Sequence, residues 1–258
     1  MTCPASTILS LQRWSAAPRE RRAGPLPISG CANIYRGMVR NPQRLAPPLA
    51  LAGTVPWWGV ASSVFAPIIL IGGWTVAADL QPVPFNAIQR SISALGAVGM
   101  PYRWIIAVTL LGVGVCHAAT GIALRPAAEA GRALLVIGGV SSILIAVNPQ
   151  PSGGGSLAHE VFSLVGVVVM TLWPLAAVRR ELGAPFGLRP TAAVAVTVFT
   201  LALLVWFSIE LFHGPELGLA ERTVTADQSI WPLLVVLSVR WARQRWLVPA
   251  EEEAAACR

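Results

Sequence analysis

The chain of 258 residues is 55% hydrophobic and only 12% charged, with a formal net charge of +7. Soluble globular domains carry about 25% charged residues, so the composition excludes an ordinary soluble domain and indicates an integral membrane protein. All basic residues are arginine, and the four cysteines form no CxxC spacing. Neither a zinc site nor a disulfide framework is therefore predicted.

Residues 1–56 hold seven arginines among many prolines, alanines and serines, without a helical apolar stripe. Such a segment has too little apolar surface to bury for folding, so we predict a disordered, basic cytoplasmic tail. Met38 is followed by a short basic stretch and then by apolar sequence, so a true start near Met38 is the alternative.

Six apolar runs follow this tail. A bilayer core about 30 Å thick takes about 20 apolar residues in a helix. The last run is the weakest, because only twelve uncharged residues separate Asp227 from Arg240, and these cover about 18 Å of helix. We predict an all-α, polytopic six-helix bundle over residues 57–246 and a cytoplasmic tail over residues 247–258. The predicted spans are residues 57–78, 104–124, 133–148, 157–178, 191–212 and 229–243.

Arginine is distributed unevenly between the two sets of connectors. Sixteen of the nineteen arginines lie in the tails or in the second-to-third and fourth-to-fifth connectors, whereas the other side holds only Arg90, Arg103 and Arg222. The positive-inside rule places the arginine-rich side, with both termini, in the cytoplasm. We expect a multi-pass protein of a bacterial plasma membrane.

The first outer connector, FNAIQRSISALGAVGMPYRW from Phe85 to Trp104, is rich in polar residues. Ser91 is predicted to cap a short helix that runs through Leu95. Arg90 and Arg103 lie at the depth of lipid headgroups, and guanidinium groups bind phosphate in a bidentate manner. Interfacial anchoring, with a salt bridge to Asp79 or a loop acid, is the favoured role of these arginines. The alternative is recognition of an anionic lipid or substrate.

Histidines and carboxylates gather in the other two outer connectors. Glu210 and His213 share a helix face, and His159 with Glu160 forms a second pair. Together with Asp227, these residues could hold the metal of a hydrolase that activates water. Their number and spacing fall short of an established ligand set, so we predict no metal.

A hydrolase without a metal would need a different pair of residues. Ser91 or Ser93 would be the nucleophile, and His159 or His213 would be the base. The alternative is an interfacial belt of polar groups in which His159 bonds to a loop carbonyl.

His117 lies thirteen residues into the second predicted span, among small residues. An ionisable group inside a span is a functional candidate, and proton relay and haem ligation are the roles to consider. His159 and His213 lie near the outer boundary and offer no second axial ligand at that depth, so no cofactor is predicted. The alternative is a neutral His117 bonded to a carbonyl or to Ser141 or Ser142.

Several motifs resemble the integral membrane family known as domain of unknown function 998. They are SISALGAVGMPYRW at Ser91–Trp104, GIALRP at Gly121–Pro126, the proline-glycine loop before His159, and GLAERTVTADQSIW at Gly218–Trp231. The resemblance covers residues 57–245 and implies six spans, with no reaction attached. The positions that it singles out are Ser91, Ser93, Gly96, Gly99, Arg103, His159, Glu221 and Arg222. The acid that often precedes the Ser-x-Ser motif in this family is missing here.

The leading hypothesis is a membrane protein that binds or handles a lipid-like or small amphipathic ligand at its outer-leaflet face. The residues expected to bind that ligand are Arg90, Arg103, His159, Glu221 and Arg222. The alternatives are a metal- or serine-dependent hydrolase at the same face and a small-molecule or proton-coupled transporter. The expected partners are membrane lipids and not nucleic acid, with a homo-oligomer or contacts with other membrane proteins left open.

Overall fold

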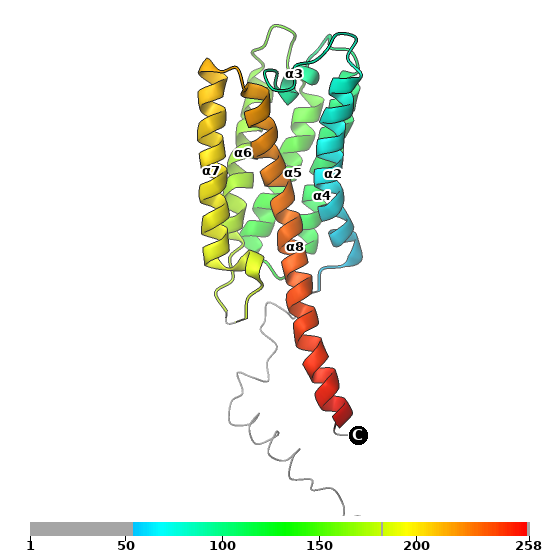
Figure 1. The fold of residues 1–258 in the computed structure, drawn as a ribbon, viewed down its shortest axis with the longest axis vertical. Coiled ribbons are helices and arrows are strands. Elements are labelled where there is room, and N and C mark those ends of the chain that lie inside the picture. The colour runs from blue at the N-terminus through cyan, green and yellow to red at the C-terminus, as the bar shows by residue number, and fades with distance from the viewer. Residues whose placement is uncertain (1–53, 182, 257–258) are drawn as a thin grey trace, which may run out of the picture. The chain divides into compact units, whose positions relative to one another are not determined.

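The computed structural model describes residues 54–181 and 183–256, and all regular structure in these ranges is helical. The elements are α2 (Trp57–Asp79), α3 (Ile92–Leu95), α4 (Arg103–Ala123), α5 (Glu129–Val147), α6 (Leu157–Ala176), the 3₁₀ turn η3 (Phe186–Leu188), α7 (Pro190–His213) and α8 (Leu217–Ala256). The six long helices run side by side, and the short α3 lies at one end of the bundle (Figure 1). The predicted all-α bundle is confirmed for these residues, whereas the predicted start near Met38 and nearly all of the 1–56 tail lie outside them.

Five of the long helices are long and apolar enough to cross a membrane: α2, α4, α5, α6 and residues Pro190–Phe212 of α7. This confirms the multi-pass membrane class. The helix α8 is not among them, and it carries Glu221, Arg222, Asp227 and Arg240. Its 40 residues form a single helix about 60 Å long, far longer than the predicted span 229–243, and helix continues through most of the predicted tail 247–258.

The third span begins earlier than predicted. The helix α5 starts at Glu129, four residues before the predicted boundary. Arg132 lies inside its first turns, where the side chain donates to the carbonyls of Gly121 (3.1 Å) and Ile122 (3.0 Å) at the end of α4. Arg132 therefore satisfies free carbonyls of a neighbouring helix end, a role that its charge alone did not suggest.

The helices α4 and α5 approach closely through small residues. A Cβ atom added at Gly114 would lie 2.5 Å from the Gly139 carbonyl oxygen, and one added at Gly139 would lie 2.5 Å from the Gly114 carbonyl oxygen. Such mutual approach of two backbones requires glycine on both sides. The contact holds these two spans in a fixed register.

Two hydrophobic clusters occupy the two ends of the bundle. At the α3 end, Ile92 and Leu95 of α3 are buried against Leu70, Trp74 and Ile106. At the opposite end, the cluster contains the fully buried residues Leu124, Leu135, Trp173, Leu188 and Val236. Arg179 fastens this second end by donating to the carbonyls of Pro126 (2.8 Å) and Ala127 (3.1 Å).

Candidate functional site

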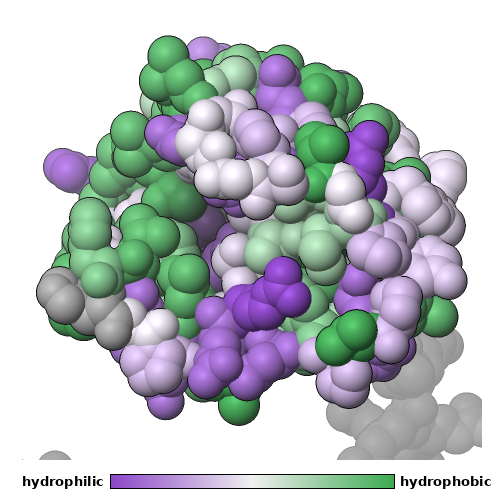
Figure 2. Space-filling model, turned by 90° about the horizontal axis from the view of Figure 1, so that it is seen from above, coloured by the Kyte–Doolittle hydropathy of each residue, from purple (hydrophilic) through white to green (hydrophobic). Residues whose placement is uncertain are grey.

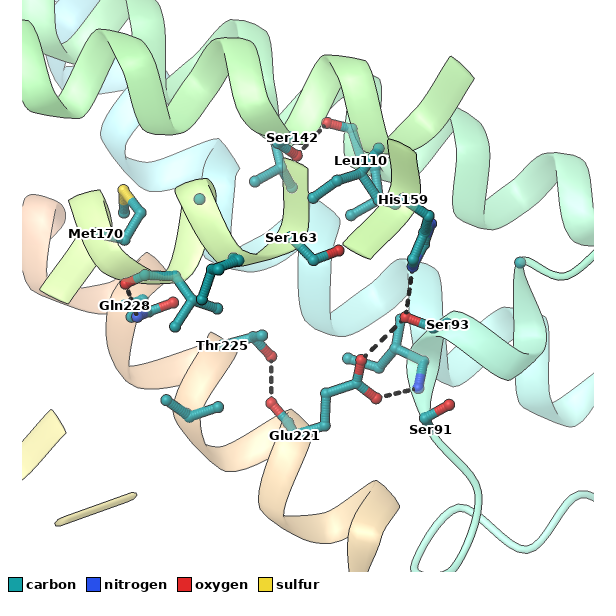
Figure 3. A pocket seen from close by; sticks show the side chains of 18 of the residues that line it. Ser91, Ser93, Leu110, Ser142, His159, Ser163, Met170, Glu221, Thr225 and Gln228 are labelled. Atoms are coloured by element: carbon teal, nitrogen blue, oxygen red, sulfur yellow. Dashed lines mark hydrogen bonds between the residues drawn. The ribbon is translucent and has the colours of Figure 1, made fainter. Parts of the chain in front are cut away.

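The short helix α3 carries the two serines of the Ser-x-Ser motif into the site. The Ser91 hydroxyl accepts the Ala94 N–H (3.0 Å), so the predicted N-cap is confirmed. Ile92 and Leu95 anchor the helix, since they are only 6% and 0% exposed. This burial leaves Ser93, on the other face of α3, to point toward α6 and α8 (Figure 3).

Ser93 lies between a histidine and a carboxylate in one chain of hydrogen bonds. Its Oγ is 3.2 Å from Nε2 of His159 and 3.3 Å from Oε1 of Glu221. The other imidazole nitrogen, Nδ1, lies 3.0 Å from the Asn148 carbonyl oxygen, and the other Glu221 oxygen accepts the Ile92 N–H. Figure 3 shows His159, Ser93 and Glu221 meeting at one end of the site.

The number of protons in this chain follows from its two ends. The Asn148 carbonyl only accepts, so Nδ1 of His159 carries a proton. Three consecutive hydrogen bonds from this carbonyl to the carboxylate require three protons. They are present either as an imidazolium with a carboxylate or as a neutral imidazole with a protonated carboxyl, and the two forms interconvert by proton transfer through Ser93.

Opposing influences act on the proton affinity of Glu221. It lies in the second turn of α8, beside the 85–104 connector and ahead of the segment predicted to cross the membrane. Burial raises its pKa above the ordinary value, against the opposing effects of the Ile92 N–H, the Arg222 charge and the Ser93 hydroxyl. In this structure the Ser93 hydroxyl donates to Oε1 of Glu221.

The chain of hydrogen bonds lies at one end of a cavity of about 760 Å³. Polar residues line this α3 end, including Ser91, Ser93, Arg103, His159 and Glu221. The walls below are mostly apolar and come from α4, α5, α6, α7 and α8, with Val113, Val168, Met170, Leu204, Phe207 and Val224 among them. Seen from the α3 end, the molecule is hollowed, with hydrophobic residues along one side of the hollow and hydrophilic residues at its depth (Figure 2).

The cavity ends inside the bundle. Met170 and Gln228 lie at the end of the site remote from His159 (Figure 3). Gln228 is satisfied there, because its amide donates to the Val167 carbonyl and the Thr171 hydroxyl. Beyond this level lies the packed cluster around Trp173.

The arginines expected to bind a ligand have different surroundings. Arg103 lines the cavity. Arg90 lies outside the lining, with its guanidinium 4.7 Å from the centre of the Phe85 ring. Arg222 also lies outside the lining and donates through NH1 to the carbonyls of Ala87, Arg90 and Gly218, so it ties the connector to α8, while its buried NH2 has no partner.

The residues considered for a metal site are not gathered together. No group of three potential metal ligands occurs within residues 54–181 and 183–256. Glu210 accepts the Glu216 N–H (2.8 Å), and Asp227 accepts the Thr200 hydroxyl (2.6 Å). Glu160 lines the cavity beside His159, and the side chain of His213 lies outside the described residues.

The family model described as "Protein of unknown function (DUF998)" matches residues 45–238. The chain belongs to the DUF998 family. This confirms the resemblance carried by the sequence motifs, and the match extends from before α2 to Ser238 in α8. Searches of curated proteins and of solved structures found no match to this chain.

In this DUF998 protein, sequence reasoning anticipated one contact of the site and missed another residue. The structure bears out the alternative in which His159 bonds to a loop carbonyl, and it identifies that carbonyl as the one of Asn148. Ser229 lines the cavity with a buried hydroxyl that has no hydrogen-bond partner, and it was taken for the start of a span. The available signal was Gln228-Ser229, two adjacent polar residues followed directly by an apolar run.

Proposed function

We propose that this DUF998 protein binds a lipid-like amphipathic molecule, with the polar group of the ligand at the α3 end of the cavity and its chain between the helices. The cavity of about 760 Å³ carries the proposal, because polar side chains line one end and apolar side chains line the walls. Burial of a hydrocarbon chain against such walls is favourable by about 25 cal/mol per Å² of apolar surface. Hydrogen-bonding groups at one end then fix its orientation.

The wall formed by α6 and α7 supports entry of the ligand from the bilayer. Leu164, Val168 and Leu211 line the cavity and are also 63%, 44% and 54% exposed. In a membrane, these side chains face lipid. A hydrocarbon chain therefore reaches the cavity between α6 and α7 without passing through water.

The charges at the α3 end select the kind of polar group. Arg103 faces this end together with the carboxyl groups of Glu160 and Glu221. A purely anionic headgroup would meet both carboxyl groups, so this end of the cavity disfavours a purely anionic ligand. A zwitterionic or hydroxyl-rich headgroup matches this mixture of donors and acceptors.

We also propose six crossings, with the α3 end in the outer leaflet. The sixth crossing is α8, because Val235, Val236 and Val239 are buried in the same cluster as residues of the apolar helices. The orientation follows from the positive-inside rule. Among the described residues, three arginines lie at the α3 end and eight lie at the other.

Narrowing the cavity tests the proposal. The probe is a lysophosphatidylcholine with a diazirine in its acyl chain, added to the protein in phosphatidylcholine nanodiscs. We expect crosslinks on cavity residues such as Leu204 and Phe207. Ala146 lines the cavity from α5, so Ala146→Trp should reduce labelling at these residues at least several-fold.

Ala133→Trp is the matched control, because Ala133 lies on an exposed position of the same helix and outside the cavity lining. It should label like the wild type. Equal labelling of the two variants, or crosslinks confined to the outer faces of the helices, would contradict binding in the cavity.

A serine hydrolase is the second candidate, and the contact between Ser93 and His159 favours it. Nε2 of His159 would take the hydroxyl proton as Oγ of Ser93 attacks an ester carbonyl, and the leaving alcohol would take that proton before water cleaves the acyl-serine. A fluorophosphonate probe should then label the wild type and Ser91→Ala but not Ser93→Ala. Ligand binding ranks first because the Ser93 hydroxyl is shared with Glu221.

A further inference from the structure

Two polar groups at the deep end of the cavity lack hydrogen-bond partners. They are Nδ1 of His117 on α4 and Oγ of Ser229 on α8. Both residues line the cavity, and they are only 4% and 1% exposed. A buried polar group without a partner costs free energy of order 1–3 kcal/mol, so a group that bonds to either one inside the cavity stabilises the complex.

The other deep polar residues have their partners within the protein. The Ser142 hydroxyl donates to the Leu110 carbonyl (2.7 Å), and the Gln228 amide donates to Val167 and Thr171. Nδ1 of His117 has no partner among the described residues, so this nitrogen makes none of the bonds to a carbonyl, Ser141 or Ser142 that the alternative for His117 named. Nδ1 of His117 and Oγ of Ser229 are without such partners.

The two groups lie at similar distances from the starts of their helices. His117 is fourteen residues from Arg103 at the α3 end of α4, which corresponds to about 21 Å, and Ser229 is twelve residues from Leu217 at the start of α8, or about 18 Å. Along α8, Ser229 lies about 12 Å beyond Glu221. The apolar side chains of the cavity walls lie between the polar residues at the α3 end and the deep pair of His117 and Ser229.

The charged residues that line the cavity, Arg103, Glu160 and Glu221, all belong to the α3 end. A charged group at the deep end would therefore lose its hydration without an opposite charge nearby. A hydroxyl or carbonyl oxygen avoids this cost and can bond to an imidazole nitrogen or to a serine hydroxyl.

We infer that the ligand is polar at both ends: a polar headgroup is held at Ser93, His159 and Glu221, and a neutral hydroxyl or carbonyl at the far end of its apolar chain is held by His117 and Ser229. This inference rests on the proposed function and narrows its ligand class. A fatty chain without a distal polar group contacts the apolar walls but leaves His117 and Ser229 without hydrogen-bond partners. A chain with a distal oxygen pairs them.

Two alkyl glucosides that differ only at the chain end test the inference: decyl glucoside and ω-hydroxydecyl glucoside. Their affinities are measured by displacement of the diazirine lysolipid in nanodiscs. The wild type should bind the ω-hydroxy compound about fivefold more tightly, the effect of one additional net hydrogen bond. In His117→Leu and Ser229→Ala this preference should shrink toward unity, while the affinity for decyl glucoside stays within about twofold.

Ser142→Ala is the matched control, because Ser142 lines the same cavity and already bonds to a carbonyl; it should keep the preference. Unchanged decyl glucoside binding shows that a variant is folded, and His117→Gln, which keeps a hydrogen-bonding group, should retain part of the preference. If the wild type binds both glucosides equally, or if both deep variants keep the preference, the two-ended ligand is wrong and cavity binding stands. Failure of both glucosides to displace the label would instead overturn the proposed function.

Discussion

Ser93 lies between His159 and Glu221, which compete for its single hydroxyl proton. Which of them accepts that proton depends on whether Glu221 is ionised. Burial holds the pKa of Glu221 above its ordinary value of 4.5 in the folded protein. The folded state therefore binds this proton more tightly than the unfolded chain does. The resulting stability is fully present below about pH 4.5 and is lost as the pH rises through the raised pKa.

Glu221→Gln keeps the shape of the side chain and cannot ionise. We expect this variant to lose less stability than the wild type as the pH is raised from 4.5 toward neutral, as measured by unfolding in mixed detergent micelles at a series of pH values. Glu129→Gln changes an exposed carboxyl at the other end of the bundle and serves as the control. Parallel curves for wild type and Glu221→Gln would show that Glu221 does not titrate in this range.

At the scale of elements, the contact between α4 and α5 depends on the absence of side chains. Gly114→Ala would place a methyl group 2.5 Å from the Gly139 carbonyl oxygen and 2.7 Å from Ile143, so we expect it to destabilise the protein by about 1–3 kcal/mol. Gly72→Ala is the matched control, because nothing lies within 4 Å of its added Cβ atom. It should be neutral or slightly stabilising in the same unfolding measurement.

The sequence predicts features that arise from interactions between residues close together in the chain, and it does not predict features that join distant residues. The apolar runs and the Ser91 cap are local, so composition and spacing predicted five spans and α3. The set of Ser93, His159 and Glu221 joins residues 66 and 128 positions apart. The residue pattern offered Ser93 with His159 as one of four possible nucleophile–base pairs, but it did not connect Glu221 to them. The start of α8 was missed because its polar residues, such as Gln228, find partners only in the folded bundle.

At the scale of the whole molecule, the arginine distribution predicts which end faces outward. In a variant whose native cysteines are replaced by serine, Ser152→Cys lies at the α3 end and Ala130→Cys lies near the start of α5 at the other end. A membrane-impermeant maleimide should label Ser152→Cys on intact cells and Ala130→Cys only after lysis. The reverse pattern would invert the orientation, and labelling of both sites on intact cells would change the number of crossings.

The packed cluster around Trp173 closes the cavity beneath Met170, and Arg179 ties the loops together at that end. The hollow at the α3 end and the exposed lining residues of α6 and α7 all lie on one side of this cluster. In this conformation, a bound molecule therefore enters and leaves on the α3 side of the cluster. Such a cavity can store, present or chemically alter a bound molecule. Moving that molecule to the opposite leaflet would first require the cluster around Trp173 to separate.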